Sequence, residues 1–254
     1  MDKLIRQQAI SLMAPPFDFQ SRALLYLMGK REDLIVKTLS DVLRMEDSSR
    51  RIKSEHRLLP EELIRWNQSL KTRGYFDDSS GLKAPKKTGR VDLSCLDPNA
   101  KPELLIEVKA WSATDAVDNS RYKETKQYNH SLLKSFEIDA LKLLAVKGGE
   151  NVKRLIVTAL FTVHCDNLSL AQMKRMGLPF VGLLNKQNID KAGIGNSDAY
   201  RIAGLRQIIN QFQSNFGEGT ELNAEFINVS AFGREDAILD GVGLSLDLIG
   251  ASLK

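Results

Sequence analysis

The amino-acid sequence predicts a mixed α/β fold with a helical N-terminal part. Apolar residues recur at helical intervals through the first third of the chain, and two strand-like segments joined by a turn follow in the middle. A buried strand, a helix and further strands then alternate towards the C-terminus. This order is typical of a central sheet covered by layers of helices.

One domain is expected over the whole of residues 1–254. The chain is 43% hydrophobic, which is enough to close one good-sized core. Within it we expect a mainly helical N-terminal part (1–73), a central core (74–217) and an acidic C-terminal part (218–254).

The first third contains three expected helices. Residues 17–28 and 32–44 place apolar side chains on one helical face, and a helix over 60–70 begins with a proline and two acids. The polar stretch SSRRIKSEHR (48–57) is predicted to be a loop. Residues 74–89 are rich in Gly, Ser, Asp and Lys, which indicates an irregular connection.

An antiparallel hairpin is expected in the middle of the chain. Residues 90–96 alternate apolar and polar side chains, and residues 104–111 form a short apolar run interrupted only by Glu107 and Lys109. The sequence Asp-Pro-Asn at 97–99 provides turn chemistry between them.

The second half alternates helices and strands. Its clearest helix has a Ser cap, a regular apolar face and a terminating Gly217. The expected helices cover 120–145, 169–176 and 197–216, and the expected strands cover 154–163, 179–184 and 224–231.

Composition argues for a soluble, cytoplasmic protein. No apolar run reaches the roughly eighteen residues of a membrane span, and the N-terminal residues lack the pattern of a secretory signal. The two cysteines, Cys95 and Cys165, are expected to be buried thiols in a reducing compartment. The three histidines do not pair with them at zinc-ligand spacing.

Positive charge is concentrated in the larger part of the chain. Residues 218–254 hold seven acids and two bases, so residues 1–217 carry 34 bases against 25 acids, a net charge of +9. This excess favours a polyanionic partner. Charge alone is equally compatible with an ordinary soluble surface.

The hairpin carries the residues with the clearest chemistry. Because side chains alternate along a strand, Glu107 and Lys109 project from one side, whereas Leu104, Ile106 and Val108 are expected to point into the core. If the neighbouring strand turns Asp92 towards them, two carboxylates converge on a hard cation such as Mg²⁺. Lys109 is then placed to position or help deprotonate an attacking water and to stabilise growing negative charge.

A structural interpretation of the same residues remains open. Glu-x-Lys alone is a weak pattern, and Glu124-Thr125-Lys126 repeats it in a polar helical stretch. The charges at 107 and 109 stand in an apolar strand, where an unpaired charge is costly. A cross-strand Asp–Lys pair on a half-exposed sheet is the alternative explanation. Catalysis requires Asp92, Glu107 and Lys109 to meet in an open, water-accessible cleft.

The segment GRVDLSCLDPNAKPELLIEVKAW resembles the core hairpin of the PD-(D/E)XK nuclease superfamily. That family's pattern is an acid on one strand, a variable hairpin, then Glu/Asp-x-Lys on the next strand and a helix. Asp92, Glu107 and Lys109 match it position by position, although Val91 replaces the proline of the family's name. The resemblance implies a restriction-endonuclease-like fold, a central mixed sheet flanked by helices, with residues 74–217 as the catalytic core.

The resemblance also implies an activity. It is closest to type II restriction endonucleases, which implies a Mg²⁺-dependent homodimer that hydrolyses double-stranded DNA. The size of the chain and the lack of a zinc finger or ATPase motif favour this choice. The alternatives are a repair, recombination or transposon nuclease of the same superfamily, or a non-catalytic nucleic-acid-binding protein with this fold.

Further candidates surround the trio. Family members often carry an additional metal-holding acid on a preceding helix, for which Glu32 is the first candidate and Glu62 the second. Basic residues on both sides of the hairpin fit a phosphate-binding rim, although each alone is equally compatible with a solvated loop. They are Lys83, Lys86, Lys87, Arg90, Arg121, Lys123 and Lys126.

Overall fold

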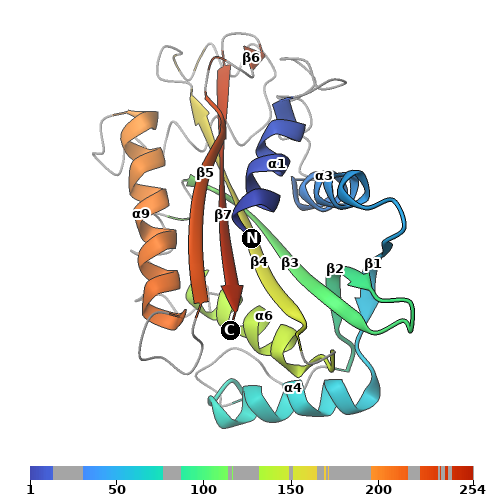
Figure 1. Cartoon of the computed structure of the whole chain (residues 1–254). Coiled ribbons are helices and arrows are strands. Elements are labelled where there is room, and N and C mark those ends of the chain that lie inside the picture. Colours follow the sequence, from blue (N-terminus) through green and yellow to red (C-terminus); the bar gives the residue numbers. More distant parts are fainter. Residues whose placement is uncertain are drawn as a thin grey trace.

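A mixed β-sheet forms the centre of the molecule, with its strands in the order β1-β2-β3-β4-β7-β5 and with β6 paired to β7 (Figure 1). The computed structural model describes residues 1–13, 31–76, 87–113, 116, 132–148, 151–164, 169, 171, 196–216, 224–233, 235, 238–239 and 242–253. The strands are β1 (Arg51–Arg57), β2 (Arg90–Leu96), β3 (Pro102–Ser112), β4 (Lys153–His164), β5 (Ala224–Phe232), β6 (Ile238–Leu239) and β7 (Val242–Leu253). The helices are α1 (Asp2–Met13), α3 (Arg31–Glu46), α4 (Pro60–Thr72), α6 (Leu132–Ala145) and α9 (Ser197–Phe216).

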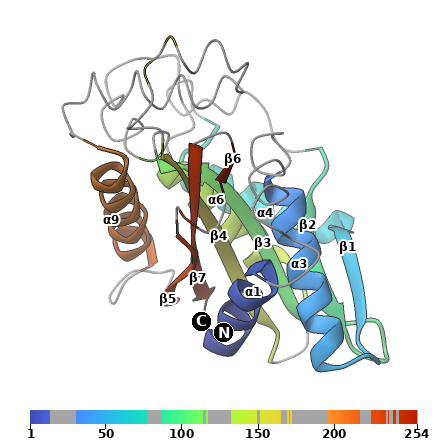
Figure 2. The same cartoon turned by 90° about the horizontal axis from the view of Figure 1, so that it is seen from above.

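Helices cover both faces of this sheet. Apolar residues of α1 and α3 pack with one set of strand side chains, and those of α4, α6 and α9 pack with the other set. Seen from above, α1 and α3 lie on one side of the sheet and α6 on the other (Figure 2). The predicted α/β class, with helices at the N-terminal end of the chain, is therefore confirmed.

The predicted hairpin is present and its strands diverge at one end. β2 and β3 pair antiparallel from Leu96 and Pro102 to Leu93 and Ile106. The turn is closed by Asp97, whose Oδ1 accepts the Lys101 N–H at 2.7 Å. Beyond Leu93, β2 continues to pair with β1 as far as Arg90. After Ile106, the N–H and C=O groups on this edge of β3 are therefore not paired with β2, and side chains can bind them.

The helix α6 connects two parallel strands. β3 and β4 pair from Leu104 and Lys153 to Ser112 and Phe161, and the chain passes between them through α6. Such a crossover places the helix over the sheet face, because parallel neighbours cannot be joined by a tight turn. α6 confirms the second half of the helix predicted over 120–145, and residues 117–131 lie outside the described part.

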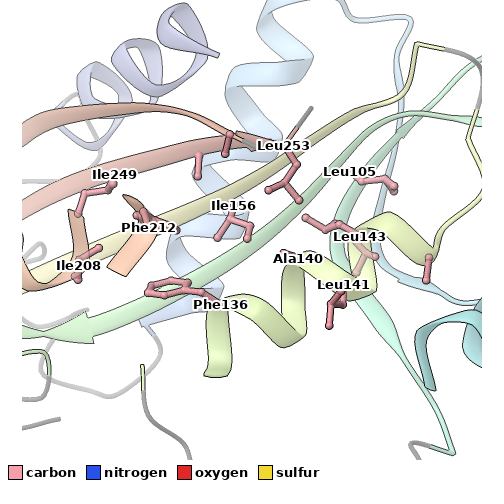
Figure 3. Close-up of a cluster of buried hydrophobic side chains, with 14 of the residues drawn as sticks. Leu105, Phe136, Ala140, Leu141, Leu143, Ile156, Ile208, Phe212, Ile249 and Leu253 are labelled. Carbon is pink, nitrogen blue, oxygen red and sulfur yellow. The ribbon is translucent and has the colours of Figure 1, made fainter. Parts of the chain in front are cut away.

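The core beneath α6 and α9 is built from aromatic and branched side chains. Phe136 of α6 lies against Phe212 of α9, with ring centroids 4.6 Å apart. Figure 3 shows these rings beside Ile156 and Ile249, which come from the sheet. α9 buries Ile208 and Phe212 of its predicted apolar face, whereas Ile202 of that face is exposed. Its N-terminal cap is Asn196, not Ser197, because Asn196 Oδ1 accepts the Ala199 N–H at 2.8 Å.

One segment was predicted wrongly, and α1, β6 and β7 were not anticipated. Residues 51–57, expected within a loop, form the strand β1, which pairs with β2 at the edge of the sheet. Most of its side chains are exposed there, which suits their polar character. α1 lies against β5 and β7. β7, within the part described only as acidic, lies between β4 and β5 inside the sheet.

Some predicted elements fall outside the described residues. They are the helix over 17–28, the helix over 169–176 apart from residues 169 and 171, the strand over 179–184 and the terminating Gly217. Within the described part of the chain, no helix has both the length and the apolar character needed to cross a membrane.

Candidate active site

β3 turns Glu107 and Lys109 towards α6. Leu105 belongs to the core under α4, α6 and α9, whereas Ile106 and Val108 belong to the core under α1 and α3. Glu107 and Lys109 share the side of Leu105 because strand side chains alternate. The predicted common face of these two residues is therefore confirmed.

Two carboxylates line the free edge of β3 where it leaves β2. Asp92 Oδ2 accepts the N–H of Val108 at 2.7 Å, and Glu32 Oε1 accepts the N–H of Ala110 at 3.2 Å. Alternate N–H groups of a strand point to the same edge, so these acids replace the ladder partners that β2 no longer provides. Asp92, Glu32, Glu107 and Lys109 are thus gathered around four consecutive residues of β3.

Helix α6 adds two charged residues that sequence reasoning missed. Lys109 Nζ lies 2.8 Å from Asp139 Oδ2, and Lys142 Nζ lies 2.8 Å from Glu107 Oε1. Lys142 Nζ is also 3.2 Å from Asp139 Oδ1. The four residues form one alternating chain of charges, in the order Glu107, Lys142, Asp139 and Lys109.

The sequence contains a sign of these residues. Asp139 and Lys142 are spaced three apart in LLKSFEIDALKLLA, an otherwise mainly apolar helix. Residues at this spacing share one face, and charges on a buried face need partners. The partners themselves could not be identified without knowing that α6 crosses β3.

The charge network is largely closed to solvent. Glu107 is 1% exposed and the side chains of Asp139 and Lys142 are 8% and 10% exposed, whereas that of Lys109 is 20% exposed. Asp92 is half-buried. The expected open cleft is therefore wrong for Glu107 in this conformation, because Lys142 and α6 cover it.

Burial and neighbours shift the pKa values of the two strand residues in the same direction. Burial raises the pKa of Glu107 well above its usual range, Asp139 adds to the shift, and Lys142 opposes it. Burial alone lowers the pKa of Lys109, but the negative charges of Asp139, Glu107 and Glu32 outweigh it and raise this pKa. Lys109 is therefore a permanent ammonium at neutral pH, suited to stabilising negative charge.

The donor set fits a divalent cation that keeps several of its waters. Asp92 and Glu107 provide two carboxylates, which is the number that Mg²⁺ commonly takes from a protein. Four carboxylates (Glu32, Asp92, Glu107 and Asp139) face two ammonium groups, a net charge of −2 when all are ionised. Glu107 Oε1 and Asp139 Oδ2 have ion-pair contacts but no hydrogen bond of good geometry within the described part.

A metal ion at this site would have two protein carboxylates as ligands, those of Asp92 and Glu107. Among the described residues, no three His, Cys, Asp or Glu side chains are grouped closely enough to hold a metal by themselves. Glu62 stands apart from the site, since it accepts the N–H groups of Leu59 and Lys147, both at 2.8 Å. Glu32 is therefore the nearer of the two additional acids.

The predicted phosphate-binding rim is described only in part. Lys87 and Arg90 are exposed at the start of β2, and Arg90 forms an ion pair with Glu55 at 2.5 Å. The other rim candidates lie outside the described residues, namely Lys83, Lys86, Arg121, Lys123 and Lys126.

Comparison with family models, with characterised proteins and with solved structures gave no match for this chain. Its function is therefore inferred from the residues of the site and their geometry.

Proposed function

We propose that the protein is a Mg²⁺-dependent endonuclease of the PD-(D/E)XK class that hydrolyses double-stranded DNA. The observation that carries the proposal is the placement of Asp92 at the Val108 N–H, between the positions of Glu107 and Lys109 on β3. Two strands that diverge beside an acid and a Glu-x-Lys pair, followed by a helical crossover, fit the resemblance of the hairpin to that class.

Each residue has a role that its surroundings support. Asp92 and Glu107 would hold the metal ion, which when bound neutralises phosphate charge and activates water for attack. Lys109 stays charged and stabilises the negative charge that grows on the phosphate oxygens. Asp139 fixes the position of the Lys109 ammonium through the 2.8 Å contact, and the negative charge of Glu32 adds to the shift that keeps it protonated.

Charge and the resemblance to type II restriction endonucleases support the proposed substrate class. The net positive charge of residues 1–217 favours a polyanion. A homodimer, as in type II restriction endonucleases, would present one site to each strand of a twofold-symmetric target. We therefore propose double-stranded DNA and a dimer as the acting form.

One observation favours a second function. Glu107 is sealed beneath Lys142 in this conformation, as expected for a nucleic-acid-binding protein in which the charges serve only to join α6 to the sheet. The nuclease proposal requires this cover to open when metal and DNA bind. The two functions therefore differ in whether the protein cuts DNA.

The test is incubation of the purified protein with plasmid and phage DNA in Mg²⁺ and in EDTA. Discrete bands that require Mg²⁺ support a restriction enzyme, and a smear or structure-selective cutting supports a repair or recombination nuclease. Glu107→Gln and Lys109→Met should abolish cutting. Glu103→Gln and Lys101→Met, matched changes at exposed hairpin positions, should leave it intact. DNA binding without any cutting would establish the non-catalytic function.

A further inference from the structure

Lys142 forms an ion pair with the buried Glu107. Its Nζ lies 2.8 Å from Glu107 Oε1, and both side chains are almost completely enclosed. A carboxylate in such a place is costly unless a positive charge accompanies it. Lys142 therefore provides the positive charge that a metal ion would otherwise supply at this carboxylate.

Lys142 has other partners within reach. Its Nζ is 3.2 Å from Asp139 Oδ1 and 5.8 Å from the centre of the Trp66 ring. Asp139 and the ring can keep the ammonium paired after its contact with Glu107 is lost. Release of Glu107 therefore does not leave Lys142 as an isolated buried charge.

From these contacts we propose that Lys142 is an internal counter-cation that occupies the metal position at Glu107 and moves towards Asp139 when a divalent ion binds. The inference rests on the proposed metal site of Asp92 and Glu107. Metal ion and ammonium compete for one carboxylate, since two cations at such short range repel each other. Lys142 is thus a positioning residue that weakens metal binding and keeps the site closed until metal enters.

The experiment measures metal binding and stability without any cleavage. Binding of Mn²⁺ is followed by electron paramagnetic resonance, and thermal unfolding is recorded with and without Mn²⁺, for the wild type, Lys142→Met and the control Lys147→Met. We expect Lys142→Met to bind Mn²⁺ at least about tenfold more tightly, because a repelling charge is gone. It should also melt lower than the wild type without metal and recover with it. Lys147 has an exposed side chain just after α6, so its variant should behave as the wild type.

The outcomes separate this inference from the proposed function. Wild-type Mn²⁺ affinity in Lys142→Met, with no extra stabilisation by metal, overturns the role of Lys142 and leaves the metal site standing. No Mn²⁺ binding by either protein overturns the site itself, and this inference with it. If Lys142→Met does not fold, Lys142→Gln keeps a hydrogen-bond donor near Glu107 without the charge, and the same gain in affinity is expected.

Discussion

Lys109 of β3 and Asp139 of α6 form an ion pair in which Nζ and Oδ2 are 2.8 Å apart. The pair joins the proposed catalytic strand to the helix that crosses over it, thirty positions further along the chain. The position and the protonation of Lys109 therefore depend on how α6 docks on the sheet.

Asp139→Asn should slow cleavage and narrow its pH range. Asp139 is the largest of the charges that raise the pKa of Lys109. Without it, only Glu107 and Glu32 oppose the effect of burial and this pKa falls, so that activity should be lost at a lower pH on the alkaline side of the pH–rate profile. The control is Glu137→Gln on the same helix, whose partners are Arg73 and Tyr75. Identical alkaline limbs in Asp139→Asn and the wild type would contradict the role of Asp139.

Asp92→Asn and Lys109→Ala should abolish cleavage while the protein still folds and binds DNA. Asn retains an oxygen for the Val108 N–H, and Asp139 keeps Lys142 at 3.2 Å when Lys109 is removed. Asp92→Ala leaves that N–H without its acceptor and should cost about 1–3 kcal/mol of stability. Cleavage rates and DNA affinity, measured by fluorescence anisotropy in Ca²⁺, test both parts. Wild-type cleavage by either Asp92→Asn or Lys109→Ala would remove the proposed site.

The metal-free protein should lose stability as pH rises above the ordinary carboxyl range. Burial, followed by Asp139, raises the pKa of Glu107 above its usual 4.5. Just above pH 4.5 the folded state retains a proton on Glu107 that the unfolded state has released, so the free energy of unfolding falls with increasing pH. Urea denaturation at successive pH values from 4.5 upwards should show a shallower fall for Glu107→Gln than for the wild type. If the free energy of unfolding changed equally with pH in both proteins, Glu107 would be ionised at every pH tested.

Arg201→Ala should destabilise the protein by about 3–5 kcal/mol. Arg201 of α9 contacts both oxygens of Asp247 on β7, each at 2.6 Å, and Asp247 is 1% exposed. Removal of the guanidinium leaves a buried carboxylate without its counter-charge. The double variant Arg201→Met with Asp247→Leu should recover most of the loss, which chemical denaturation can measure. A double variant as unstable as the single one would show that packing, not charge, dominates here.

Phe212→Ala should destabilise the protein by about 3–5 kcal/mol. Phe212 is fully enclosed between Phe136 and Phe226, with ring centroids 4.6 and 5.5 Å away, and truncation leaves a cavity at the centre of this core. Ile202 on the same helix is exposed, and Ile202→Ala should change stability by less than about 0.5 kcal/mol. A comparable loss in both variants would contradict the observed burial of α9.

The hairpin could be predicted because its pattern is local. Three signals depend only on neighbouring positions: the alternation in β2, the turn residues at 97–99 and the apolar run in β3. Together they favour an antiparallel pair. The same alternation is present in β7, where Leu244, Leu246 and Leu248 are all buried. The expectation for residues 218–254 included a strand over 224–231 but not β7.

The edge strand β1 shows why some elements resist prediction. Its residues RIKSEHR have no apolar periodicity, since only Ile52 packs against a core and most of the strand is exposed. It is a strand because β2 offers a free row of N–H and C=O groups. That partner lies more than thirty positions away in the chain, so no local pattern reveals it.

The sequence by itself determined the α/β class, the hairpin and the common face of Glu107 and Lys109, because strand and helix periods act over a few residues. Tertiary structure alone decided which charges meet: Asp139 and Lys142 with the strand pair, and Asp92 and Glu32 with the free edge of β3. These contacts depend on the docking of α6 and α3 and on the divergence of β2 from β3. Because these charges are largely buried, the attraction between them is screened far less than in water, and each charge strongly affects its neighbours.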